Sequence, residues 1–218
     1  MKAIIKNYLK RYDNLLDIAS FVYNIPSINA LFKGNFRGTF LKNIRLDISG
    51  GNATVKCGRG TRLINCRIYI KGNNVSINVG ERCILQNLEL WIEDDNGCIT
   101  IGNYTTIEGG HIAATEGGMI SIGDDCMFSS QIQIRNGDSH SIYDLESKMR
   151  INHAKDVKIG NHVWLGINTT ILKGSELSDN TIVGSGTIIS SIDSKPNCIY
   201  AGNPARQIRT NVLWRRER

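Results

Sequence analysis

A short phrase built around one glycine recurs along the middle of this chain. It reads VKCGRGTRL, INVGERCIL, ITIGNYTTI, ISIGDDCMF and VKIGNHVWL. Its glycines are Gly58, Gly80, Gly102, Gly123 and Gly160, so successive copies lie 22, 22, 21 and 37 residues apart. A period near twenty with β-type alternation predicts a solenoid of stacked strands rather than of helices.

The residue three positions after each phrase glycine is small or β-branched. These residues are Thr61, Cys83, Thr105, Cys126 and Val163. We expect this side chain at a tight internal corner of each coil, with aliphatic residues on the inner faces. Glycine, Asn or Asp would supply the turn conformations that a β-branched residue resists. Because one coil cannot bury its own face, several coils must stack.

The composition agrees with a turn-rich, reduced protein. Twenty-two glycines against three prolines fit many tight turns rather than collagen or disorder. The six cysteines contain no C-x-x-C pair, so no zinc ribbon or thioredoxin-like site is predicted. Cys66, Cys83 and Cys126 lie in or beside apolar runs, where a reduced thiol serves as a small hydrophobe. This pattern favours a reducing cytoplasm.

Residues 1–34 are predicted to form a separate N-terminal helical segment. Apolar residues from Ile4 to Tyr23 fall at helical spacing, with Lys10 and other charges on the opposite side. Those charges interrupt every apolar run, so neither a signal peptide nor a transmembrane span is predicted. The helix should end before Pro26. We expect its apolar face to pack on the protein or a neighbouring subunit, with peripheral contact at the inner membrane as the alternative.

The formal charge is +6 at pH 7. A basic balance favours acidic partners, such as a nucleotide cofactor, an anionic polymer or a membrane face, without choosing among them. No nucleic-acid partner is predicted.

The last gap between phrase glycines exceeds the usual period by about 16 residues, and this surplus must leave the coil as an extruded loop. We place the loop at residues 136–155, in the polar segment GDSHSIYDLESKMRINHAKD. Long excursions from a rigid scaffold often carry functional sites. His140, between small and acidic neighbours in this loop, is therefore the candidate reacting group.

The repeats resemble the hexapeptide repeat of the left-handed parallel β-helix acyltransferases. An aliphatic residue recurs at every sixth position at Ile159, Leu165, Ile171, Leu177 and Val183. The resemblance covers roughly residues 50 to 200 and implies an all-β fold. We expect a left-handed parallel β-helix over residues 35–205, followed by a C-terminal tail, residues 206–218.

The loop and the next coil resemble those of sugar and antibiotic O-acetyltransferases of that family. In these enzymes the loop begins with the catalytic histidine, and an IGNxVWIG coil follows whose tryptophan lines the acetyl site. This chain has His140 in GDSHS and Trp164 in IGNHVWLG, 24 residues apart. The resemblance is to the galactoside and capsular-polysaccharide branches, and the sialic acid and polysialic acid O-acetyltransferases are the likeness we suggest.

The expected chemistry suits these residues. Transfer of an acetyl group from a thioester to a sugar hydroxyl needs a base, and a histidine of ordinary pKa, ~6.5, can take and return that proton. Backbone amides or the Trp164 indole N–H could hold the developing oxyanion. No Ser or Cys motif suggests an acyl-enzyme, so the acceptor would attack directly. Asp138 or Asp144 would orient the imidazole of His140.

The other three histidines are expected to be less important. His111, after EGG, is expected in a surface turn, with a place in the same cleft as the alternative. His153 lies in the loop, and His162 occupies a polar turn position. Histidines on a β-helix also resemble the zinc site of γ-class carbonic anhydrases. His140, His153 and His162 do not reproduce that set, so no metal is predicted.

The end of the chain resembles the cofactor segment of the same family. Ala201–Ile208 match its closing AGNPAR-x-I. The resemblance implies acetyl-CoA in a groove between subunits of a homotrimer, with backbone contacts at Gly166 and Ser185. Arg206 and Arg209 would lie near the phosphates, or would be ordinary solvated charges.

One departure from the family concerns a lysine. Related enzymes often have Thr-Lys where this chain has Ser190 and Ser191, so that contact would be lost or supplied by Lys195. The final NVLWRRER is expected to pack on the N-terminal helix or to bind an anionic polymer.

The favoured function is that of a cytoplasmic, acetyl-CoA-dependent O-acetyltransferase. Its acceptor would be a bacterial surface saccharide or its precursor, with a sialic acid or polysialic acid capsule as the suggested example. The alternatives are an acetyltransferase for an antibiotic or galactoside, and a non-enzymatic trimeric β-helix scaffold.

Overall fold

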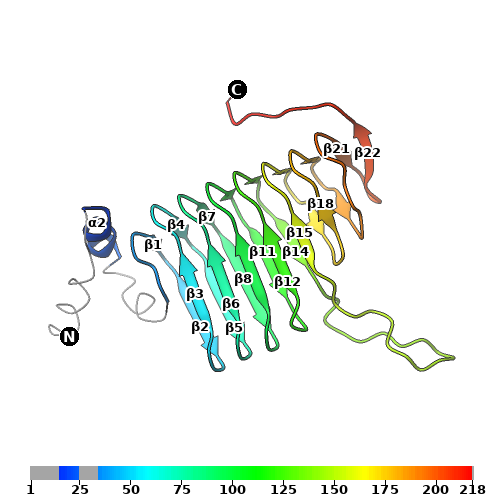
Figure 1. The fold of residues 1–218 in the computed structure, drawn as a ribbon, viewed down its shortest axis with the longest axis horizontal. Helices are drawn as coiled ribbons and strands as arrows, with labels where there is room; N and C mark the ends of the chain where they lie inside the picture. Colours follow the sequence, from blue (N-terminus) through cyan, green and yellow to red (C-terminus); the bar gives the residue numbers. More distant parts are fainter. Residues whose placement is uncertain (1–14, 25–33, 218) are drawn as a thin grey trace.

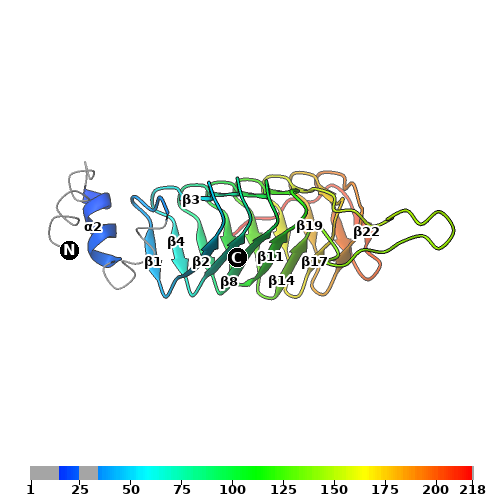
Figure 2. The same cartoon turned by 90° about the horizontal axis from the view of Figure 1, so that it is seen from below.

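The computed structural model describes residues 15–24 and 34–217. In this part of the chain the strands wind around a common axis and build three flat faces, which we call faces A, B and C (Figures 1 and 2). Successive strands in the sequence pass from one face to the next, so neighbours within a face come from successive coils and run parallel. The architecture is a parallel β-helix, as the period near twenty predicted.

Face A is the sheet of the glycine phrases and carries six strands. They are β3 (Thr54–Cys57), β6 (Ser76–Val79), β9 (Cys98–Ile101), β12 (Met119–Ile122), β15 (Val157–Ile159) and β18 (Glu176–Leu177).

Face B follows the phrase corner in each coil and carries nine strands. They are β1 (Phe40–Lys42), β4 (Arg62–Ile64), β7 (Ile84–Gln86), β10 (Thr106–Ile107), β13 (Met127–Phe128), β16 (Trp164–Leu165), β19 (Ile182–Val183), β21 (Ile199–Ala201) and β22 (Arg206–Arg209). Strand β22 pairs antiparallel with β21 at the end of the sheet. The sheet therefore continues to Arg209, past the boundary expected at residue 205.

Face C completes each coil and carries seven strands. They are β2 (Arg45–Ser49), β5 (Arg67–Lys71), β8 (Leu88–Glu93), β11 (Gly110–Ala114), β14 (Ile132–Arg135), β17 (Thr170–Ile171) and β20 (Ile188–Ile189). The hydrophobic core fills the space between the three faces with one aliphatic layer per coil. The predicted six-residue series, Ile159 to Val183, lies on five successive strands and is buried at every position.

The corner between faces A and B is held by the small residue of each phrase. Thr61 Oγ1 donates to the carbonyl of Gly80 at 2.7 Å, and Cys83 Sγ donates to the carbonyl of Gly102 at 3.0 Å. The backbone N–H of Cys83 in turn donates to Thr61 Oγ1 at 3.0 Å. All five small side chains are buried, and the four Thr and Cys side chains each donate to a carbonyl of the next coil, which confirms the predicted internal corner.

The phrase glycines are needed for close approach and not for turn conformation. A Cβ on Gly102 would lie 2.5 Å from Gly123 C and 2.6 Å from Asp124 N in the next coil. The positive φ of this corner falls two residues later, as at Tyr104 (59°) and His162 (52°). The expectation that glycine, Asn or Asp supplies turn conformations is confirmed at Gly60 (75°), Asn65 (53°) and Asp125 (52°), whereas the phrase glycine itself has another role. The backbones of adjacent coils meet at this position and leave no room for a side chain.

The cysteines lie free in this framework, and five of the six are buried. Burial raises the pKa of the Cys126 thiol to about 12. These thiols act as small apolar or weakly donating groups, as predicted for Cys66, Cys83 and Cys126.

A short helix, α2 (Leu15–Tyr23), covers the first coil. Its Asp17 is fully buried and accepts from Arg37 Nε at 2.9 Å, with Arg59 on its other oxygen. Asn24 donates to the carbonyl of Thr39 at 2.6 Å, which fixes the end of the helix to the β-helix. The expected packing on the protein is therefore confirmed for this segment. The earlier residues of the expected helix and its end before Pro26 lie outside the described residues. In the described parts of the chain, no helix is long and apolar enough to cross a membrane.

The corner geometry predicts that Gly102→Ala will destabilise the fold by about 1–3 kcal/mol, because the new methyl group must displace the backbone of the next coil. Urea or thermal unfolding measures the change, and each kcal/mol should lower Tm by roughly 2–4 °C in a chain of this length. Gly51→Ala is the matched control. Its Cβ would meet only the Asn73 side-chain oxygen, at 3.3 Å, so stability should change little. Equal stability of the two variants would contradict this account of the corner.

Candidate active site

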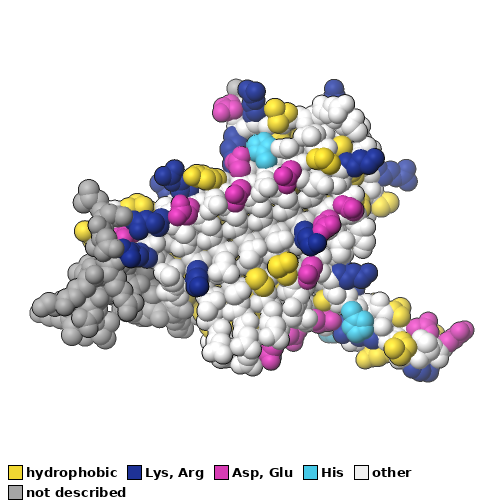
Figure 3. Space-filling view, in the orientation of Figure 1, with side chains coloured by type: hydrophobic (Ala, Val, Ile, Leu, Met, Phe, Trp, Pro, Cys, Tyr) yellow, Lys and Arg dark blue, Asp and Glu magenta, His cyan; other side chains and the backbone are white. Residues whose placement is uncertain are grey.

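The extruded loop leaves the β-helix after β14 and returns before β15, at the corner between faces C and A. It extends past the body of the helix toward the C-terminal coils (Figures 1 and 2). Tyr143 and Arg150 form an antiparallel bridge, so the outer part is a hairpin. Figure 3 shows it clear of the body, with hydrophobic, charged and histidine side chains on its surface.

The base of the loop is organised by Asn152, which is 7% exposed. Its Nδ2 donates to the carbonyl of His140 at 2.7 Å and to Asp138 Oδ2 at 3.0 Å. Its Oδ1 accepts from the Ile142 N–H at 2.7 Å. One buried amide thus fixes the backbone on both sides of His140, whose side chain remains exposed.

The two acidic candidates for orienting His140 have other partners. Asp144 Oδ1 accepts from the Ser147 N–H at 2.7 Å and shapes the turn at the loop tip. Asp138 pairs with Lys173 of the next coil, and that hydrogen bond together with the one from Asn152 lowers its pKa despite slight desolvation. Asp138 therefore fixes the base of the loop to the coil below.

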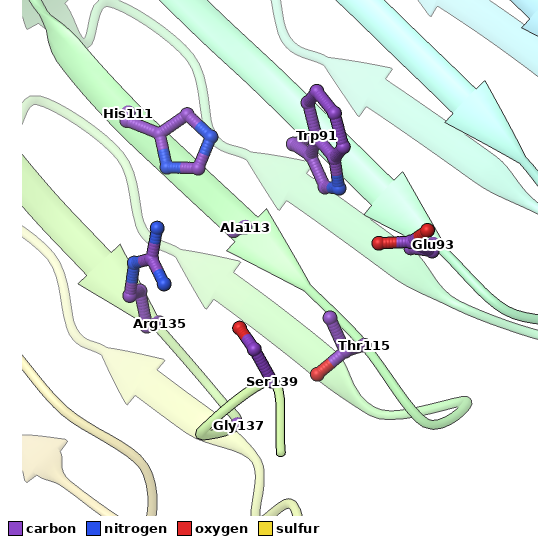
Figure 4. A pocket seen from close by; sticks show the side chains of 8 residues that line it. All are labelled: Trp91, Glu93, His111, Ala113, Thr115, Arg135, Gly137 and Ser139. Carbon is purple, nitrogen blue, oxygen red and sulfur yellow. The ribbon is translucent and has the colours of Figure 1, made fainter.

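A hollow of about 220 Å³ lies on face C beside the start of the loop. It arises from one row of outward-facing residues in register across neighbouring strands: Tyr69, Trp91, Ala113 and Arg135. Ala113 is small, whereas its neighbours on both sides are large. The row therefore opens above Ala113, between Trp91 and Arg135 (Figure 4).

The rim of this hollow is polar. The polar lining residues are His111, Glu93, Thr115 and Ser139, and Ser139 is the residue directly before His140. Burial lowers the pKa of His111, and Glu89 only partly opposes this effect, so its imidazole is neutral at pH 7. Its Nδ1 is buried and has no hydrogen-bond partner among the described residues. A histidine expected in a surface turn is thus a half-buried strand residue facing the site, which is the alternative we had noted.

Trp164 lies on a different face from the loop. It projects from β16 on face B with 38% of its surface exposed. It lines a second hollow, of about 530 Å³, together with Met127, Phe128 and Glu108. Faces and corners alternate around the coil, so the corner between faces C and A lies opposite face B. The structure of one chain therefore does not bring His140 and Trp164 together.

The expected donor residues follow the corner between faces B and C. Gly166 and Ser185 are neighbours in successive coils, and a Cβ on Gly166 would lie 2.7 Å from the Ser185 N. The turn after β21 continues this line, since Gly202 N–H donates to Thr187 Oγ1 at 3.2 Å. Arg206 pairs with Ala201 at the start of β22, close to the same corner, whereas Arg209 pairs with Ile199 at the other end. Both arginines are exposed. Lys195 is exposed as well, and its N–H donates to Tyr200 Oη at 3.0 Å.

The C-terminal tail runs back over the earlier coils (Figure 1) and is fixed at the corner between faces A and B. Trp214 is 5% exposed and stacks on His162, with ring centroids 3.9 Å apart. His162 Nδ1 donates to Asp125 Oδ2 at 2.7 Å, and Arg216 Nε donates to Asp125 Oδ1 at 2.9 Å. The ring centroids of Trp214 and Trp164 lie 6.1 Å apart, so the tail supports one side of the Trp164 indole. Among the described residues, the tail thus packs on this corner and not on α2 (Leu15–Tyr23).

We call these contacts among Trp214, Arg216, His162 and Asp125 the clip. The carboxylate of Asp125 is its electrostatic centre. Burial opposes its ionisation, but hydrogen bonds from His162 and Arg216 outweigh that effect and lower its pKa. A carboxylate with a lowered pKa stabilises the docked tail above its unfolded pKa of ~3.9 and loses that effect as the pH falls further. No group of three His, Cys, Asp or Glu suited to a metal ion occurs among the described residues.

The sequence did not reveal the hollow or the clip. The hollow depends on which residues share a row, and this follows only from the exact register of the coils. The recurrence of aromatic residues 22 positions apart, Tyr69 and Trp91, was the available signal. The clip joins residues far apart in the sequence, and no repeat relates them.

The clip predicts that Trp214→Ala will release the tail, because both the stacking on His162 and the burial of the indole are lost. Limited trypsin digestion at pH 7 should then remove the tail faster by an order of magnitude or more, since opening costs less free energy. Leu213→Ala, at a neighbour that is 67% exposed, is the control and should leave the rate unchanged. Equal cleavage of the two variants would contradict the clip.

Comparisons with known proteins agree with this architecture. Residues 156–191 match the bacterial transferase hexapeptide family of six repeats. A polysialic acid O-acetyltransferase of Neisseria meningitidis is 42% identical over 113 residues, which cover 52% of this chain and 53% of that relative. The chain thus matches about half the length of this curated relative.

Two solved structures match over most of the chain. The polysialic acid O-acetyltransferase OatWY is 36% identical with a TM-score of 0.73, over 83% of this chain and 91% of that one. The polySia-specific acetyltransferase NeuO is 29% identical with a TM-score of 0.67, over 80% and 90%. These matches confirm the predicted left-handed parallel β-helix. Taken with the repeats, they show that this chain belongs to the hexapeptide-repeat acetyltransferase family.

Proposed function

We propose that this protein is an acetyl-CoA-dependent O-acetyltransferase that modifies a hydroxyl of an acidic capsular saccharide, such as polysialic acid. The observation that carries the proposal is the position of His140, on a loop fixed by Asn152 at the rim of the hollow on face C. The similarity to two polysialic acid acetyltransferases over about nine-tenths of their length supports the choice of acceptor.

The active site would lie between subunits of a homotrimer. His140 and Trp164 occupy opposite sides of one chain, so a shared site needs His140 from one subunit and Trp164 from its neighbour. The loop supports this arrangement, because five large apolar side chains on it are 53–84% exposed: Ile142, Tyr143, Leu145, Met149 and Ile151. Such a group on a monomer would be an unusual exposed patch, whereas a second copy of the chain would cover it.

His140 would act as general base. Its imidazole takes the proton from the acceptor hydroxyl while that oxygen attacks the thioester carbonyl. The new O–C bond forms, the C–S bond breaks, and the imidazolium returns its proton to the leaving thiolate. The Trp164 indole N–H or backbone amides would stabilise the oxyanion. The clip around Trp214 would keep Trp164 in place.

The corner between faces B and C suits an extended donor. Gly166 and Ser185 lie in successive coils whose backbones approach closely there, and an extended amide chain would run along this line. Arg206 at the end of the line would pair with phosphates, with Arg209 and Lys195 as further cations. When bound, acetyl-CoA supplies the activated acetyl group.

We also place the reaction in the cytoplasm. The free cysteines fit a reducing compartment, which is where acetyl-CoA is available. Peripheral contact with the inner membrane is an arrangement that the basic net charge of +6 would allow.

The proposal predicts that His140→Ala will lower kcat by ~100- to 10,000-fold, because the general base is lost. Acetyl-CoA binding should persist, since no donor contact is removed. Release of free thiol, measured with polysialic acid as acceptor, gives the rate. His153→Ala changes an exposed histidine of the same loop and is the matched control. Near-full activity of His140→Ala in a folded trimer would contradict the assignment. Transfer to chloramphenicol or a galactoside, but not to sialic acid polymers, would instead favour a small-molecule acetyltransferase.

A site shared between subunits predicts complementation. His140→Ala and Trp164→Ala subunits should each be impaired, but co-expressed subunits should form mixed trimers that contain intact sites. Random assembly around a threefold axis makes about three quarters of the trimers mixed, each with one intact site of three. The unfractionated mixture should therefore recover about a quarter of wild-type activity, and isolated mixed trimers about a third. The activity of the isolated mixed trimers checks this. No recovery above that of the separate variants would place the site within one chain.

A further inference from the structure

We propose that the hollow on face C is an acidic-sugar subsite, in which Arg135 binds the carboxylate of the acceptor and Trp91 stacks on its ring. This inference rests on the proposed function and names the residues that select an acidic saccharide. Ala113 forms the floor, and Trp91 and Arg135 form the two walls (Figure 4).

Tyr69 and Arg67 hold Trp91 in position on the side away from the hollow. The Tyr69 ring stacks on it, with centroids 3.7 Å apart and an interplanar angle of 18°. The Arg67 guanidinium lies 5.7 Å from the centroid of Trp91 and 5.4 Å from that of Tyr69. Asp47 and Glu89 both bind Arg67 at 2.8 Å. The face of Trp91 toward Tyr69 is therefore covered, whereas the face toward Ala113 borders the hollow. A rigid indole with one free face suits the apolar face of a sugar ring, because stacking removes both surfaces from water.

Arg135 is the half-buried cation of this face that has no carboxylate partner among the described residues. The other two arginines of face C, Arg45 and Arg67, both pair with Asp47. Arg135 instead lines the hollow and contributes to the lowered pKa of His111. A guanidinium in such a place can form two parallel hydrogen bonds with a carboxylate, which fixes the orientation of the ligand.

The remaining lining fits the rest of a sugar ring. His111 is neutral and its buried Nδ1 has no partner among the described residues, while Thr115 and Ser139 add hydroxyl groups. The volume of about 220 Å³ is below the ~300 Å³ of ordinary small-molecule pockets, so the hollow would hold one ring of a longer chain. Ser139 directly precedes His140, so a ring in the hollow would present its hydroxyls to the general base.

The binding test uses the His140→Ala protein, which cannot turn over, with α2,8-linked oligomers of sialic acid and the same oligomers after reduction of their carboxylates to alcohols. Addition of Arg135→Gln should weaken binding of the acidic oligomer by about 10- to 100-fold, because charge-assisted hydrogen bonds are lost. Binding of the reduced oligomer should not change. Arg62→Gln, the same substitution at an exposed arginine of face B, is the control and should have little effect.

Filling the hollow gives a second, independent measurement. Ala113→Leu places a larger side chain between Trp91 and Arg135, so acceptor KM should rise while acetyl-CoA affinity stays constant. Sedimentation checks that the Ala113→Leu variant has the same oligomeric state as the wild-type protein.

If Arg135→Gln weakened binding of the acidic and the reduced oligomer equally, the inference would be overturned. A changed oligomeric state would also overturn it, because the row of Tyr69, Trp91, Ala113 and Arg135 would then be a subunit contact. The proposed function fails separately. Arg135-dependent binding without any acetyl transfer would leave the subsite standing and reject the enzyme. Acetyl transfer that is insensitive to Arg135→Gln and Ala113→Leu would support the enzyme and reject the subsite.

Discussion

The fold depends on one hydrogen bond repeated at the corner between faces A and B. A buried Thr or Cys donates to the carbonyl of the phrase glycine in the next coil, as Thr105 does to Gly123 at 2.9 Å. Because that glycine has no side chain, the backbones of the two coils can approach closely enough for the bond. A small donor and a bare glycine are thus needed together. Their repetition sets the stacking of every coil between Thr61 and Gly160.

Stacking in exact register makes the outer rows as ordered as the inner ones. On face C, it aligns Tyr69, Trp91, Ala113 and Arg135, so that a single small residue opens a hollow. The loop carries Ser139 into the lining of that hollow, and Asn152 fixes the backbone of the next residue, His140. The β-helix backbone therefore fixes the positions of side chains that have few contacts of their own.

The features that depend on the repeat could be predicted from the sequence, whereas contacts outside the repeat could not. The β-helix, its buried six-residue series, the internal corner and the loop all followed from periodicity. The neutral His111 in the hollow and the tail packed on His162 did not, because each depends on contacts that no period encodes. The close approach of coils at the phrase glycine did not follow from the period either. A sequence cannot distinguish a glycine needed for its φ from one needed for close approach. The roles of His140, Trp164 and the donor-site residues remain predictions.

The docked tail has a consequence for how the chain folds during synthesis. Coils make contact with the next coil across only about twenty residues, so they can stack in order as they leave the ribosome, and the contact order of the body stays low. The tail is different, since Arg216 Nη1 donates to Thr106 Oγ1 across 110 residues. That contact forms only after Arg216 itself has left the ribosome. The support behind Trp164 is thus added after the β-helix, and nascent chains with a complete β-helix still lack it.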